Sequence, residues 1–70
     1  MIVFTPRQCD VMTCVAHDLT IPQTASQLHL APRTVKYHLE AAKERAGVRS
    51  ITALIAQALI SGSIVVEPTH

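Results

Sequence analysis

Basic side chains gather in one stretch of this 70-residue chain. Five of its six Lys and Arg residues fall within residues 33–49: Arg33, Lys36, Lys43, Arg45 and Arg49. With two carboxylates they give that stretch a net charge of +3, whereas one Arg and three carboxylates give the rest −2. A local basic face is what contact with phosphates requires. The chemistry to expect is therefore ionic and hydrogen-bonding contact with nucleic acid, with an ordinary solvated helix face as the alternative.

The same stretch divides into two faces when it is placed on a helix of about 100° per residue. One narrow stripe is apolar, with His38 beside it, and contains Val35, Leu39, Ala42 and Ala46. The opposite side is polar and contains Arg33, Lys36, Tyr37, Glu40 and Glu44. A longer helix with basic residues in its first two turns, preceded by a tight turn and a short helix, is typical of the helix-turn-helix. The first turns of its second helix contact base edges in DNA.

Two similar tetrads predict where the preceding helices begin. TPRQ at residues 5–8 and TIPQ at residues 20–23 each place Gln three residues after Thr. This is a capping box, in which the Thr oxygen accepts from a first-turn amide and the Gln side chain accepts from the Thr amide. Proline is tolerated there because first-turn amides have no helical partner. Helices are therefore expected over about residues 6–18 and 21–28.

Proline, serine and glycine bound the other two helices. Pro32 begins the basic helix, and Gly47 ends it as a left-handed C-cap. Ser50 can cap a fourth helix that ends near Gly62. We expect one all-α domain of four helices over residues 1–70, with the motif at about 20–46 and the last helix at about 51–61. The tail IVVEPTH is expected to form a short extension or to fray.

Other kinds of function find little support in the residues. Cys9 and Cys14 are five apart, so a helix places them on different faces, and free thiols in a reducing cytosol are expected. No His/Cys spacing suits zinc, and no nucleophile stands beside a plausible base. The N-terminus lacks the features of a signal peptide, and the uncharged run ITALIAQALISGSIVV is too short for a membrane span. We expect a cytoplasmic, nucleoid-associated chain without enzyme activity, cofactor, metal or membrane contact.

The segment PRTVK, followed in register by HL and then GVRS, resembles the LuxR/FixJ-type helix-turn-helix family. That family reads roughly LTPRExEVL and, after a short helix, SPRTVKxHLxxIxxKLGVxSRTEL. The match covers about residues 4–59. The resemblance implies a four-helix LuxR-type domain that binds double-stranded DNA as a homodimer and regulates bacterial transcription. Its recognition helix, here residues 32–46, enters the major groove, and its fourth helix contributes to dimerisation. Stand-alone members of this size exist.

Matching the family residue by residue assigns roles to the basic helix. Lys36 matches the main base-reading position, and Tyr37 follows it at the groove. Arg33 and Thr34 match positions that hold the DNA backbone. With the charged residues that follow, the predicted DNA-binding set is Arg33, Thr34, Lys36, Tyr37, Glu40, Lys43 and Arg49.

The chain departs from the family pattern at several positions. Ala31 replaces the usual Ser, so the N-cap of the recognition helix is lost at a typical cost of about 1 kcal/mol. Asp18 and His29 replace common glycines at helix ends. Glu40 stands where many members carry a basic or neutral residue. It could accept from a cytosine N4, lower the affinity for all DNA, or pair locally with Lys36 or Lys43.

The fourth helix has lost its charges, because Ile51 and Ala53 replace the charged residues of SRTEL. Its apolar residues cover more surface than one small core needs, which usually marks a partner surface. The predicted dimer interface is Ile51, Leu54, Ile55, Ala58 and Leu59. A second hypothesis is that the protein has this fold but does not bind DNA. It would then be a protein-interaction module, a small antagonist or co-regulator that pairs with another LuxR-type regulator or with RNA polymerase.

Overall fold

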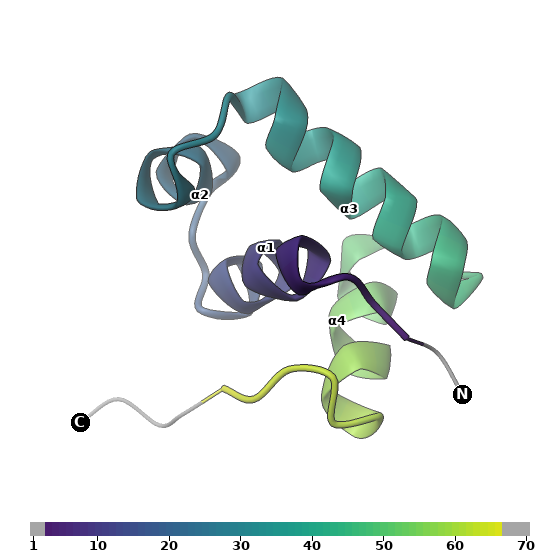
Figure 1. Ribbon diagram of the computed structural model, residues 1–70. Helices are drawn as coiled ribbons and strands as arrows, with labels where there is room; N and C mark the ends of the chain where they lie inside the picture. Colours follow the sequence, from purple (N-terminus) through teal and green to yellow (C-terminus); the bar gives the residue numbers. More distant parts are fainter. Residues whose placement is uncertain (1–2, 67–70) are drawn as a thin grey trace.

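Four helices and no strand make up residues 3–66, the part of the chain that the computed structural model describes (Figure 1). The helices are α1 (Pro6–Ala16), α2 (Ile21–Leu28), α3 (Pro32–Ala46) and α4 (Ile51–Ile60). The predicted all-α fold and the starts of all four helices are confirmed. The first helix ends two residues earlier than expected, because Asp18 adopts a left-handed conformation with φ of 67°.

Local hydrogen bonds begin three of the helices. The Thr5 hydroxyl accepts from the Gln8 amide at 3.1 Å, and the Thr5 amide donates to Gln8 Oε1 at 3.0 Å. Thr20 and Gln23 form the same reciprocal pair at 3.2 and 2.8 Å. Ser50 Oγ accepts from the Ala53 amide at 3.1 Å. Both predicted capping boxes and the predicted cap of α4 are therefore present.

The third helix starts without such a cap, since Ala31 has no side-chain acceptor. We predict that Ala31→Ser raises the free energy of unfolding by about 1 kcal/mol, because its hydroxyl can accept from a first-turn amide. Urea denaturation measures the change. As a control, Ala56→Ser at an exposed position inside α4 offers no cap and is expected to lower stability by a few tenths of a kcal/mol. Equal effects of the two substitutions would contradict the prediction.

The core lies between α1 and α3, each of which packs against the other three helices. The short α2 and the apolar α4 contact these two helices but not each other, and Figure 1 shows them at separate places around α1. The fully and nearly fully buried apolar residues form one cluster: Phe4, Val11, Met12, Ala25, Val35, Leu39, Ala42, Leu54, Ala58 and Ile64. The predicted apolar stripe of the third helix therefore faces the core.

The chain after α4 returns to this core. Gly62 takes a left-handed conformation with φ of 74°, and the amides of Ser63 and Ile64 donate to the Ala58 carbonyl at 2.9 and 3.3 Å. Ile64 is only 5% exposed. The expected short extension thus exists up to Val66, and the expectation for residues 67–70 lies outside the described residues.

Two residues of the predicted dimer interface belong to this core instead. Leu54 and Ala58 are both 0% exposed, and they lie on the face of α4 that packs against α1 and α3. In this fold neither side chain has surface left for contact with a second copy. The sequence of α4 is apolar all round, so its periodicity did not distinguish the inward face from the outward one. No helix within residues 3–66 has the length and apolar character needed to cross a membrane.

Candidate nucleic-acid interface

A three-residue turn joins α2 to α3 and sets the angle between these two helices (Figure 1). His29 ends α2 in a left-handed conformation with φ of 58°. The Leu30 amide then donates to the Ala25 carbonyl at 2.9 Å, which closes the turn. Pro32 begins the next helix, at a position where the fixed φ of proline suits the first turn. A short helix, a tight turn and a longer helix therefore follow one another as the sequence predicted.

The first two turns of α3 present their polar face to solvent. Arg33, Lys36 and Tyr37 are all exposed, with Tyr37 at 68%. Val35 and Leu39, on the opposite side, are in the core, while Thr34 is half-buried between the two faces. These two turns thus carry two cations and a phenol outward, and they contain no carboxylate.

His38 lies beside the exposed polar face of α3 and contacts Tyr37. It is half-buried beside the core stripe, as expected, and its ring meets the Tyr37 ring edge-on with 5.6 Å between the centroids. An edge-to-face arrangement is a favourable geometry for aromatic rings. His38 therefore limits the directions in which the exposed Tyr37 side chain can point.

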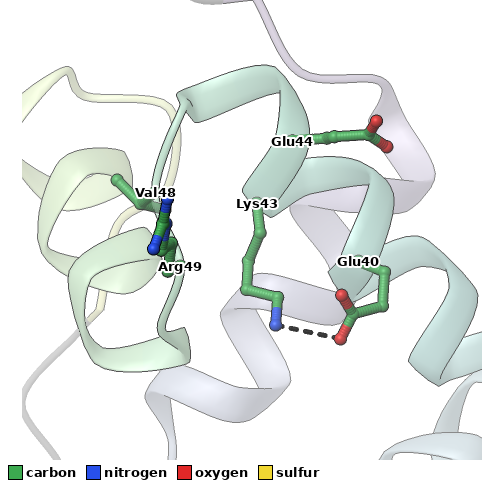
Figure 2. Close-up of a pocket in the computed structure, with 5 residues that line it drawn as sticks. All are labelled: Glu40, Lys43, Glu44, Val48 and Arg49. Atoms are coloured by element: carbon green, nitrogen blue, oxygen red, sulfur yellow. Dashed lines mark ion pairs between the residues drawn. The ribbon is translucent and has the colours of Figure 1, made fainter.

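The second half of α3 carries carboxylates beside its cations, unlike the first two turns. Lys43 Nζ lies 2.9 Å from Glu40 Oε1, and the side chains are 17% and 69% exposed respectively. They border a hollow of about 310 Å³ together with Glu44, Val48 and Arg49 (Figure 2). Glu40 therefore forms the local pair with Lys43 that the sequence raised as one alternative, and Arg49 faces the hollow from the turn that follows α3.

Arg45 is directed to another part of the molecule. Its guanidinium donates to the Val3 carbonyl at 2.8 Å, which holds the segment before α1 against the end of α3. This contact joins residues 42 apart in sequence, so no local pattern could have revealed it. Within residues 3–66, the two ion pairs involve none of Arg33, Lys36 and Arg49. These three exposed cations are therefore the ones open to an external anion.

The two cysteines of this chain lie in α1 and are partly or fully buried. Cys9 and Cys14 are free, and burial, with a smaller contribution from the Asp10 carboxylate, raises the pKa of both thiols. Thiols with a raised pKa stay protonated and are weak nucleophiles. Residues 3–66 contain no cluster of three side chains suited to a metal ion.

A second surface lies between the end of α1 and α4. It is a groove of about 390 Å³ lined by Val15, Ala16, Ile51, Thr52, Ile55, Ala56 and Leu59. Ile51, Ile55 and Leu59 of the predicted interface line this groove, and Leu59 is 44% exposed. The α1 side of the groove, Val15 and Ala16, was not predictable from the sequence, because only the fold brings that helix end beside α4.

Comparison with known proteins gives consistent matches. Residues 2–58 match the family of bacterial regulatory proteins, luxR family. Two proteins from Mycobacterium tuberculosis strains CDC 1551 and H37Rv, each described as probable transcriptional regulatory protein NarL, are 35% identical over 57 residues. That match covers 81% of this chain and 26% of each relative, so the chain spans about a quarter of their length. The solved structure of transcription factor GerE is similar with a TM-score of 0.88 and 20% identity, covering 91% of this chain and 96% of that one.

Proposed function

We propose that this chain, which belongs to the luxR family of bacterial regulatory proteins, reads a specific sequence of double-stranded DNA with the first turns of α3. Its family and its fold are those of DNA-binding transcription regulators. The observation that carries the finer proposal is the exposed set Arg33, Lys36 and Tyr37 on the two turns that directly follow a tight helix-turn-helix connection. In this motif those turns contact base edges in the major groove.

Each exposed side chain has a distinct role in the proposal. Lys36 donates to guanine O6 and N7 in the major groove, and Tyr37, held by His38, contacts the next base. Arg33 and the half-buried Thr34 hold the DNA backbone, which sets the register but reads no sequence. Arg49 contacts a flanking phosphate from the turn after α3. Such a regulator acts in the bacterial cytoplasm, at the nucleoid.

A gel-shift titration with genomic DNA fragments tests this proposal against the alternative of a protein-interaction module. The apolar groove beside α4 is the observation that favours the alternative, in which the partner is another LuxR-type regulator or RNA polymerase. Sequence-specific binding predicts that one or a few fragments shift at roughly 10⁻⁸ M protein or below in the presence of competitor DNA. An interaction module predicts that no fragment is preferred at any concentration.

The same groove supports a homodimer that reads two half-sites. Ile51, Ile55 and Leu59 line it from α4, and a self-complementary apolar patch is the usual basis of a two-fold interface. Dimeric helix-turn-helix proteins bind half-sites one helical turn apart.

We predict that Leu59→Glu weakens self-association about tenfold, because it places a charge in the apolar contact. Analytical ultracentrifugation with and without operator DNA measures the effect. Gln57→Glu adds the same charge at an exposed position of α4 outside the groove, and is expected to leave association unchanged. A parent protein that sediments as a monomer at high concentration and binds its operator as a single copy would contradict the dimer.

A further inference from the structure

The ion pair between Glu40 and Lys43 engages a lysine of the predicted DNA-binding set. Lys43 is half-buried, with 17% of its side chain exposed, whereas Arg33, Lys36 and Arg49 are exposed. Figure 2 shows the Lys43 ammonium directed at the Glu40 carboxylate, while Glu44 points away from both. The Lys43 charge is therefore neutralised within the chain.

We infer that Glu40 limits the affinity of this chain for DNA, by holding the Lys43 ammonium in a pair that a DNA phosphate has to replace. The inference rests on the proposed DNA binding and adds a regulating residue to it. Glu40 follows Lys36 by one helical turn, so it lies on the outward face that approaches the groove. The Glu40 side chain is 69% exposed, so a DNA phosphate can approach the pair.

The balance of charge along α3 shows what the pair does. The hollow beside the second half of α3 is bordered by two cations and two carboxylates, so it carries no net charge. The first two turns carry Arg33 and Lys36 without a carboxylate. Affinity for DNA comes largely from phosphates neutralised by cations, with release of about 0.9 counterion for each. DNA contact is therefore concentrated in the first two turns, and the second half of α3 adds nothing to it while the pair persists.

Weak binding by one copy has a consequence for assembly. Glu40 is 69% exposed, and ion pairs between residues three apart on one helix contribute little to folding, so the fold does not need Glu40. Two weak half-sites that are joined in a dimer bind much more tightly than either alone, because the second contact becomes intramolecular. Glu40 thus makes occupation of DNA depend on both copies being present.

A double-mutant cycle tests the inference: Glu40→Gln, Lys43→Gln and the double variant, each titrated with its best genomic fragment and with random DNA from 50 to 200 mM salt. Glu40→Gln is expected to bind both DNAs more tightly and to gain one phosphate contact. That contact steepens the salt slope by about 0.9, so affinity falls about 3.5-fold more across this salt range than in the parent. Lys43→Gln alone is expected to change little, and the double variant to lose the gain.

Controls separate this mechanism from its competitors. Glu44→Gln removes a carboxylate from the same hollow that, within residues 3–66, takes part in neither ion pair, so its salt slope should stay at the parent value. The inference is overturned if Glu40→Gln gives the same gain in the Lys43→Gln background, which indicates simple repulsion. It is also overturned if Glu40→Gln relaxes preference at a single base pair, or changes nothing. A parent that binds neither DNA at 50 mM salt contradicts the proposed function itself.

Discussion

Replacing Lys36 with Ala is expected to weaken binding to the preferred DNA sequence by roughly 1–3 kcal/mol for each copy bound. A dimer with two half-sites contains the substitution twice, so the loss of affinity is on the order of 30-fold or more. Lys36 is exposed on the second turn of α3, on the side away from the core, so the fold is expected to stay intact. Fluorescence anisotropy with the preferred fragment and with random DNA measures the change.

Arg33→Ala is the matched control for the groove assignment. It removes an equal charge one turn earlier on the same exposed face. As a phosphate contact, Arg33 is expected to affect all sequences evenly, whereas Lys36 mainly affects the preferred one. The groove assignment is wrong if Lys36→Ala binds its best site as tightly as the parent does, or if the two variants lose the same affinity on random and preferred DNA.

Leu54→Ala is expected to lower the free energy of unfolding by about 2–5 kcal/mol, the usual cost of a cavity at a buried leucine. Leu54 is 0% exposed at the centre of the only large apolar cluster within residues 3–66. A domain of this size has a small reserve of stability. The variant should therefore be largely unfolded at 37 °C, which circular dichroism during thermal and urea denaturation measures.

Ile60→Ala provides the contrast on the same helix. Ile60 is 85% exposed, and surface substitutions usually change stability by less than about 0.5 kcal/mol. If Leu54→Ala instead keeps the stability of the parent and loses only self-association, Leu54 belongs to the dimer interface that the sequence predicted and the core assignment is contradicted.

Local signals made the helices of this chain predictable. Each capping box depends on residues three apart, so Thr5 with Gln8 and Thr20 with Gln23 could be identified from spacing alone. The two faces of α3 were predictable for a similar reason, since Leu39 and Lys36 differ in polarity at helical spacing. Arg33 and Lys36 are exposed, as contact with DNA requires. Their roles in DNA binding remain predictions.

Contacts between distant residues were not predictable in the same way. Phe4 and Ile64 complete the core only because the segments just before α1 and just after α4 pack against it. The Thr24 hydroxyl is buried and has no hydrogen-bond partner within residues 3–66. Because buried polar groups are usually hydrogen-bonded, the polarity of Thr24 does not predict this burial. Glu40 had two lysines within one turn, Lys36 and Lys43, and only the structure selects Lys43 as its partner.

Methylation protection on the preferred genomic fragment tests the central claim most directly, since dimethyl sulfate reports guanine N7 in the major groove and adenine N3 in the minor groove. The proposal predicts that the parent protein protects guanine N7 in two clusters about one helical turn apart, and that Lys36→Ala loses protection at one guanine in each cluster. Protection confined to adenine N3, or no protected base on any retained fragment, would contradict the claim that α3 reads DNA in the major groove.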